Sequence, residues 1–183
     1  MNNFVSRAGE KLQHALTSFN IDVAGLICAD FGSSTGGFVD CLLQNGAAKV
    51  YAVEVGYGTV DYKLRINPQV VVMEKKNAMH VVLPEKVDFI SIDVGWTKQK
   101  LIISNAFLNL KENGTIISLI KPHYEAEKRF ITKGKLMEEK IPEVLELVKK
   151  EIESVGGKVL NIVESPIEGS KGGNKEYLAL IEK

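Results

Sequence analysis

The chain has 183 residues, of which 45% are hydrophobic, and this length and composition fit one globular domain, residues 1–183, with a buried core. Its 23 basic side chains balance 23 acidic ones, so any nucleic-acid binding must come from local patches. No apolar run approaches the ~20 residues that cross a bilayer, and no charged-then-apolar leader opens the chain. We therefore expect a cytoplasmic protein with no membrane contact.

Cys28 and Cys41 lack metal-ligand spacing, so we expect neither a disulfide nor a metal site.

Apolar and amphipathic runs alternate along the chain, which predicts an α/β fold, a mostly parallel sheet with helices on both faces. A first helix, capped by Ser6 and running to about Phe19, forms a short N-terminal extension. The seven expected strands occupy residues 26–31, 49–54, 70–74, 87–93, 114–120, 157–164 and 175–182. The further helices are expected at 37–45, 59–66, 98–110 and 136–154, with a weaker turn at 76–80. Residues 170–174 are too few for a crossover helix, so the last strand is expected to run antiparallel, as a hairpin with the sixth.

A glycine-rich turn joins the first strand to the helix that follows it. Its Gly-x-x-x-Gly-Gly pattern differs from the Gly-x-Gly-x-x-Gly turn that binds a pyrophosphate. Glu54 ends the next strand, where a carboxylate accepts hydrogen bonds from ribose hydroxyls. These features favour S-adenosylmethionine, which has no phosphate, over a nicotinamide cofactor, and Asp30 and Asp93 would attract its sulfonium. The alternative is that Asp30 only caps the turn. The residues of the turn expected to bind the cofactor are Asp30, Gly32, Ser33, Ser34, Thr35, Gly36, Gly37 and Phe38.

Four charged residues, Lys11, Asp93, Lys121 and Glu176, stand in apolar surroundings at the ends of predicted elements. Because carboxyl ends of parallel strands meet at one edge, Asp93 and Lys121 are expected within salt-bridge reach beside the glycine turn. Glu176 alternates with the apolar residues of the last strand and needs a basic partner. One interpretation is a pair of structural ion pairs. We favour a catalytic cluster, because active sites tolerate the cost of desolvating several charges more often than cores do.

Two basic positions near the start of the chain, Arg7 and His14, fall with Lys11 on one face of the first helix. The pattern alone favours a solvated flank for this face. Further along, basic residues alternate with Tyr124 and Phe130 in the segment 124–135, a composition suited to stacking splayed bases and contacting phosphates. A solvated loop is the alternative. The residues expected to contact RNA are Arg7, His14, Lys98, Lys128, Arg129, Lys133 and Lys135.

Several ordered motifs extend over nearly the whole chain. They lie at 5–12, in the glycine turn with 38–43, and at 47–58, 92–94, 121–122, 165–167 and 173–178. With these motifs the chain resembles the FtsJ-like ribose 2′-O-methyltransferases, most closely the hemolysin-A-like (TlyA) branch that methylates ribosomal RNA. The resemblance implies a Rossmann-like class I methyltransferase fold and S-adenosylmethionine as cofactor. It also implies a Lys-Asp-Lys-Glu quartet, matched by Lys11, Asp93, Lys121 and Glu176, and a cofactor pocket lined by Gly36, Phe38, Glu54, Asn77 and Asp93.

The chain departs from this family at two places. Asp93-Val94-Gly95-Trp96 replaces the usual Asp-Val-Ser-Phe, and five residues precede Ser6, where the family carries a small RNA-binding domain. The resulting hypothesis is 2′-O-methylation of ribosomal RNA, free or in a ribosomal subunit. Lys121 would take the hydroxyl proton, oriented by Asp93 and Glu176, with Lys11 near the 2′-oxygen. The alternatives are a methyltransferase for another RNA or a small molecule, and a non-catalytic, ribosome-associated cofactor-binding protein.

Overall fold

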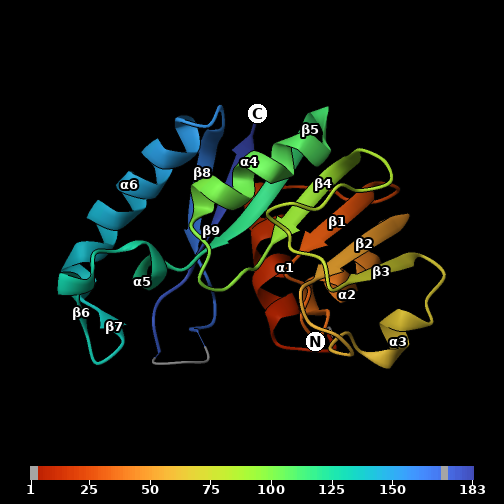
Figure 1. Cartoon of the computed structure of the whole chain (residues 1–183), viewed down its shortest axis with the longest axis horizontal. Helices are drawn as coiled ribbons and strands as arrows, with labels where there is room; N and C mark the ends of the chain where they lie inside the picture. The colour runs from red at the N-terminus through yellow and green to blue at the C-terminus, as the bar shows by residue number, and fades with distance from the viewer. Residues whose placement is uncertain (1–3, 170–172) are drawn as a thin grey trace.

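A seven-stranded sheet forms the centre of the computed structural model, which describes residues 4–169 and 173–183 (Figure 1). The strand order is β3-β2-β1-β4-β5-β9-β8, and the first five run parallel, whereas β9 is antiparallel to both β5 and β8. The central strands are apolar along most of their length because helices cover both of their faces. The bounds are β1 (Ile27–Phe31), β2 (Lys49–Glu54), β3 (Val70–Glu74), β4 (Val87–Ile92), β5 (Leu110–Ile120), β8 (Lys158–Glu164) and β9 (Tyr177–Glu182).

Helices pack on both faces of this sheet (Figure 1). On one face, Leu12 and Leu42 belong to a buried cluster formed with α1 and α2. On the other, Ile102 and Val148 belong to a second cluster formed with α4 and α6. The helices are α1 (Ala8–Phe19), α2 (Gly37–Gln44), α3 (Tyr62–Arg65), α4 (Gln99–Asn109), α5 (Pro122–Glu125) and α6 (Ile141–Glu153). The predicted fold, a mostly parallel seven-stranded sheet with an antiparallel last strand and helices on both faces, is confirmed.

Several predicted boundaries are wrong. Ser6 does not cap α1: the cap is Arg7, without a side-chain hydrogen bond, while the Ser6 backbone carbonyl accepts from the Gly9 N–H. The helix expected at 59–66 shortens to α3. The helix expected from residue 136 begins only at Ile141, because the preceding residues form other elements. The turn expected at 170–174 lies in part outside the described residues, which omit 170–172.

The segment 124–135, for which a solvated loop was the alternative to an RNA-binding role, is largely ordered into short elements. Within and just beyond it lie a 3₁₀ turn (Lys128–Phe130) and a small hairpin of β6 (Ile131–Thr132) with β7 (Lys135–Leu136), followed by a second 3₁₀ turn (Glu138–Lys140). In Figure 1 this hairpin stands beside α5, away from the large sheet.

The strand register brings the ends of the central strands to one edge. Phe31 of β1 pairs with Val53 of β2 and with Ile92 of β4, so the residues that follow β1 and β4 are neighbours. At the same edge, Ile120 of β5 pairs with Tyr177, the first residue of the antiparallel strand β9. The start of β9 therefore joins the carboxyl ends of the parallel strands, where open α/β sheets bind their ligands.

Candidate active site

The glycine turn after β1 lies against the end of β4. Gly32 has a φ of +88°, and a Cβ at this position would collide with the carbonyl oxygen of Asp93. The Gly32 and Ser33 N–H groups both donate to the Val53 carbonyl, at 2.9 and 3.1 Å. Only glycine fits this close approach, because any side chain would push the turn away from the neighbouring strand. The turn thus forms the floor of a cleft between β1, β2 and β4.

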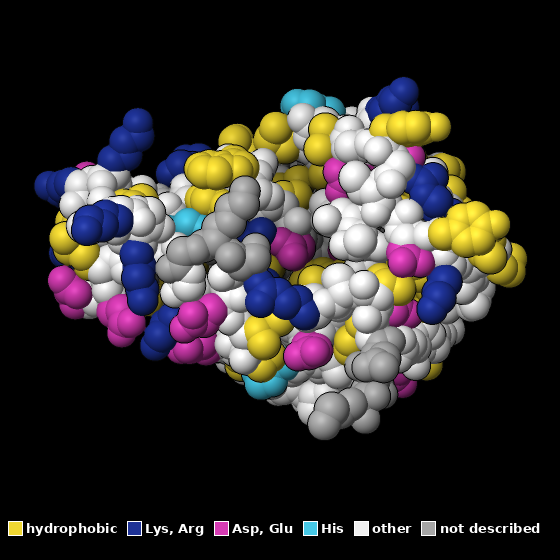
Figure 2. Space-filling model, turned by 90° about the horizontal axis from the view of Figure 1, so that it is seen from below, with side chains coloured by type: hydrophobic (Ala, Val, Ile, Leu, Met, Phe, Trp, Pro, Cys, Tyr) yellow, Lys and Arg dark blue, Asp and Glu magenta, His cyan; other side chains and the backbone are white. Residues whose placement is uncertain are grey.

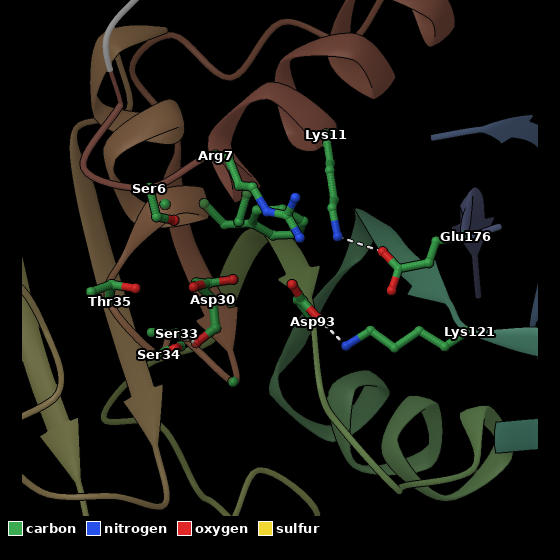
Figure 3. Close-up of a pocket in the computed structure, with 14 residues that line it drawn as sticks. Ser6, Arg7, Lys11, Asp30, Ser33, Ser34, Thr35, Asp93, Lys121 and Glu176 are labelled. Atoms are coloured by element: carbon green, nitrogen blue, oxygen red, sulfur yellow. Dashed lines mark hydrogen bonds and ion pairs between the residues drawn. The ribbon is translucent and has the colours of Figure 1, made fainter. Parts of the chain in front are cut away.

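The cleft consists of two adjoining cavities of about 260 and 540 Å³. They share Gly32, Ser34, Asp93 and Lys121 at their junction. Figure 2 shows a hollow with acidic side chains on this face of the molecule. The first cavity, drawn in Figure 3, is also lined by Ser6, Arg7, Lys11, Asp30, Ser33, Thr35, Gly37, Phe38 and Glu176, and the second by Glu54, Asn77, Ala78, Met79, Val94 and Ile102.

Asp93 and Lys121 form an ion pair at this junction, as predicted. The Lys121 Nζ lies 2.5 Å from Asp93 Oδ1 and also donates to the Val94 carbonyl at 3.2 Å. Both side chains are partly exposed, 16% for Lys121 and 22% for Asp93, and both face the cavity in Figure 3. The amine is therefore held in place and still reachable from the cleft.

Lys11 and Glu176 form a second ion pair, which is buried: the side chains are 8% and 4% exposed. The expectation of a solvated flank on the first helix is wrong for Lys11, which lies in the buried stripe beside Leu12 and Ala15. Glu176, which was expected to orient Lys121 together with Asp93, forms its ion pair with Lys11. Figure 3 shows the two pairs at one side of the same cavity, so the four predicted charged residues do converge.

Asp30 is 1% exposed at the bottom of the first cavity. Its Oδ1 accepts a 2.7 Å hydrogen bond from the Ser91 hydroxyl, while its Oδ2 is buried without a partner among the described residues. Burial, helped by the nearby charges of Asp93 and Glu54 and opposed by hydrogen bonds from Ser91 and Ser33, raises the pKa of this carboxyl to about 7. A buried carboxylate oxygen without a partner is a binding position for a cationic ligand group.

Glu54 and Asn77 line the second cavity. The two carboxylate oxygens of Glu54 accept from the Ser34 and Gly56 N–H groups, each at 2.7 Å. Asn77 is exposed, and its side-chain oxygen accepts from the Met79 N–H at 2.9 Å. Of the predicted cofactor residues, Gly36 lines neither cavity: it is buried behind the turn, where a Cβ would collide with Leu64. The rest lie on the walls of the cleft.

The residues expected to contact RNA lie at several places. Arg7 is exposed and extends into the first cavity in Figure 3, and His14 is partly exposed further along α1. Lys98 precedes α4 and donates to the Glu125 carbonyl at 3.4 Å. The remaining four are exposed on the 3₁₀ turn and the hairpin: Lys128, Arg129, Lys133 and Lys135. Arg129 is paired with Glu127 and lies over the Phe130 ring.

Tyr124 was expected to stack on RNA bases, but its ring partner Trp96, which lies between Gly95 and Thr97 of the second cavity, was missed. Trp96 is 82% exposed and has a φ of +60°, and its ring lies 4.5 Å from that of Tyr124. Tyr124 in turn lies 4.1 Å from the ring of His123. The signal available in the sequence was the unusual Gly95-Trp96 after Asp93, but the partner of Trp96 comes from the end of a different strand. The described residues contain no cluster of acidic, cysteine or histidine side chains that could hold a metal ion.

Comparison with known proteins assigns the chain to a family. The model of the FtsJ-like methyltransferases matches residues 4–183. The chain belongs to the FtsJ-like methyltransferase family. Its relatives include a protein named hemolysin A from Brachyspira hyodysenteriae, which is 42% identical over 96% of this chain and 75% of its own length. The 16S/23S rRNA (cytidine-2′-O)-methyltransferase TlyA of Mycobacterium tuberculosis is 35% identical over 95% of this chain and 66% of its own.

A solved structure described as a hemolysin from Streptococcus thermophilus superposes with a TM-score of 0.95. It is 39% identical, and the match covers 100% of this chain and 68% of that one. The present chain thus spans between about two thirds and three quarters of the length of these relatives. The resemblance expected from the motifs is confirmed, and the methyl donor of this family is S-adenosylmethionine. The partnerless oxygen of Asp30 and the close glycine turn fit such a cofactor.

Proposed function

We propose that this chain transfers a methyl group from S-adenosylmethionine to the 2′-hydroxyl of a ribose in ribosomal RNA. The observation that carries the proposal is the convergence of Lys11, Asp93, Lys121 and Glu176 beside a cleft with a partnerless buried carboxylate. The name of the mycobacterial relative, an rRNA (cytidine-2′-O)-methyltransferase, supports the choice of substrate. We further propose that residues 1–183 act as one cofactor-binding domain in the cytoplasm.

The two cavities suggest how the chain would hold the cofactor. Glu54, fixed by two backbone N–H groups, would accept hydrogen bonds from the ribose hydroxyls, with Asn77 further along the same cavity. Asp30 would attract the positively charged end in the first cavity. When bound, S-adenosylmethionine supplies a methyl group on a positively charged sulfur, which is a good leaving group.

The chain's own part in the reaction is to position the substrate and to remove a proton. Lys121 is the proposed base: after it has released its own proton to solvent, its neutral amine takes the hydroxyl proton and becomes an ammonium again. Asp93 and the Val94 carbonyl hold this nitrogen at the cleft. Lys11 lies near the site of the attacking oxygen, where its charge stabilises a developing negative charge. Glu176 holds Lys11 through the buried ion pair and so acts as a positioning residue.

The RNA would enter over the surface that carries the basic hairpin and the aromatic cluster. Trp96 and Tyr124 present two neighbouring, tilted aromatic rings beside the second cavity, and a base that has left its helix can stack on such rings. Lys128, Lys133 and Lys135 provide positive charge for phosphates nearby. Among the described residues, no helix is long and apolar enough to cross a membrane.

Reversing two charges on the 3₁₀ turn tests the RNA surface. The double variant Lys128→Glu, Arg129→Glu should bind ribosomal RNA at least tenfold more weakly at low salt and reduce the slope of log affinity against log salt by about two. Binding isotherms between 50 and 200 mM salt measure both quantities. The matched control is Lys149→Glu, Lys150→Glu on α6. An unchanged slope in the first variant would remove this turn from the RNA surface.

The buried carboxyl of Asp30 makes cofactor binding depend on pH. Because the pKa of Asp30 is raised to about 7, its carboxylate form is lost as pH falls through 7, and affinity for a cationic cofactor should fall with it, by up to about tenfold per pH unit. Asp30→Asn should bind weakly at every pH between 6 and 8. Without cofactor, Asp30→Asn should also have a higher free energy of unfolding than the wild type at pH 8, because it has no buried carboxyl to ionise. Calorimetric titration checks the affinities, and a pH-independent wild-type affinity would contradict this role.

A partition assay tests the proposed function directly. The protein is incubated with methyl-labelled cofactor and, separately, with deproteinised ribosomal RNA, isolated ribosomal subunits, other cellular RNA and a metabolite extract. Label in ribosomal RNA or in one subunit is the expected result. Label only in other RNA or in a small molecule would move the substrate to one of the alternatives. Tight cofactor binding without any labelled acceptor would indicate a non-catalytic protein.

A further inference from the structure

Asn174 connects the β6–β7 hairpin to the segment that carries Glu176. Its side chain is buried, with the residue 3% exposed. The amide nitrogen donates to the Gly134 carbonyl at 2.9 Å, and the amide oxygen accepts from the Leu136 N–H at 3.0 Å. Both partners are backbone groups of the β6–β7 hairpin. One side-chain amide therefore holds the hairpin by its turn and by its second strand.

The backbone of the same residue belongs to the segment that leads into β9. The Asn174 carbonyl accepts from the Gly169 N–H at 3.0 Å, and the Glu176 carbonyl accepts from the Ser165 N–H at 2.8 Å. Glu176 follows two residues later and forms the buried ion pair with Lys11. The connection from the hairpin to this pair is thus a single residue and a short stretch of hydrogen-bonded backbone.

Besides this amide, the hairpin is held by apolar contacts: Leu136 belongs to the core cluster, and Phe130 and Ile131 pack against it. Each of its strands has two residues, and isolated hairpins are marginally stable in water. Leu136 is buried against the core, while Lys133 and Lys135 on either side of Gly134 are exposed. A polyanion bound to these lysines would shift the position of the hairpin. Asn174 would transmit this shift to the segment that carries Glu176.

We infer that Asn174 is a positioning residue that couples binding of RNA on the β6–β7 hairpin to the orientation of Glu176, and through it of Lys11. This inference rests on the proposed function for its RNA ligand. Placement of the hairpin by RNA fixes Asn174, which fixes the start of β9 and the carboxylate of Glu176. When a substrate is too small to contact the hairpin, Lys11 would remain less well ordered and methyl transfer would be slower. The coupling would therefore make the enzyme methylate RNA faster than small hydroxyl compounds.

Single-turnover kinetics with deproteinised ribosomal RNA test the coupling. Asn174→Ala should slow methyl transfer at saturating RNA and cofactor at least tenfold, while both dissociation constants stay within about twofold of wild type. The double variant Lys133→Ala, Lys135→Ala should also slow methyl transfer. When these two replacements are added to Asn174→Ala, the rate should not fall any further. Asn161→Ala, an exposed asparagine of β8, is the matched control and should leave the rate unchanged. Rate losses that multiply in the combined variant, or a wild-type rate in Asn174→Ala, would overturn the inference.

A second readout does not depend on activity. In protein labelled with ¹⁵N-lysine, the Nζ signal of Lys11, assigned from its absence in Lys11→Met, should shift in Asn174→Ala towards its position in Glu176→Gln. An unshifted signal would overturn the positioning role. A shifted signal together with a wild-type protein that methylates no RNA would refute the proposed function and its RNA ligand, while leaving Asn174 as the residue that positions Glu176.

Discussion

Lys121→Arg is expected to bind S-adenosylmethionine with wild-type affinity and to transfer its methyl group about a thousandfold more slowly, within the range that general-base catalysis contributes. The replacement keeps the positive charge that pairs with Asp93, so the cleft should retain its shape. A guanidinium, however, does not release its proton under these conditions and cannot take one from a hydroxyl. Binding is measured by calorimetric titration, and transfer by single-turnover kinetics on the RNA that accepts label.

The matched control for this variant is Lys100→Arg. Lys100 also forms an ion pair, with Glu151 at 2.8 Å, but it does not line either cavity of the cleft. Its replacement should leave both affinity and rate unchanged. Normal turnover in Lys121→Arg would remove Lys121 from the role of base. Loss of cofactor affinity in that variant would instead assign Lys121 to binding.

Glu176→Gln is expected to cost about 3–5 kcal/mol of folding free energy, because it leaves the buried ammonium of Lys11 without its counter-ion. For a domain of this size, such a loss lowers the melting temperature by about 10 °C. Thermal and denaturant unfolding measure the change. The variant should also be inactive when folded, since Lys11 loses the carboxylate that positions it.

A second replacement separates the two effects. Lys11→Met combined with Glu176→Gln removes the unpaired charge, so most of the lost stability should return while the activity stays absent. The control is Glu164→Gln: Glu164 pairs with Lys175 at 3.7 Å on the surface, and exposed pairs contribute about 0–1 kcal/mol. If Glu176→Gln were no more destabilising than Glu164→Gln, the buried pair of Lys11 and Glu176 would contribute no more to the folding free energy than an exposed pair does.

The sheet and the position of its active edge could be predicted from the sequence because they depend on local signals. Apolar runs mark strands that are buried on both faces, and a charged residue directly after such a run, as at Asp93 and Lys121, must lie at the carboxyl edge. The glycine turn is equally local, since Gly32 is required by its own backbone conformation. These local signals place Asp93 and Lys121 at the edge beside the glycine turn, and the family resemblance adds Lys11 and Glu176 to the same quartet.

What the sequence did not predict depends on contacts between distant segments. The face of α1 that carries Lys11 looks like a solvated flank until Glu176, from the other end of the chain, is placed against it. The β6–β7 hairpin has strands too short for any periodicity to show. Trp96 and Tyr124 meet only because β4 and β5 end side by side. The hydrogen bonds from the Asn174 side chain to the hairpin could not be predicted from the sequence, because its partners are backbone groups that every residue carries.

The position of the methyl group on the product tests the central claim most directly. Ribosomal RNA labelled from S-adenosylmethionine is hydrolysed with alkali, which requires a free 2′-hydroxyl, and the fragments are identified by mass spectrometry. Labelled dinucleotides that resist the hydrolysis, formed by the wild type and absent with Lys121→Arg, are the predicted result. Label recovered in mononucleotides that carry a methylated base would contradict the assignment of Lys11, Asp93, Lys121 and Glu176 to a ribose hydroxyl.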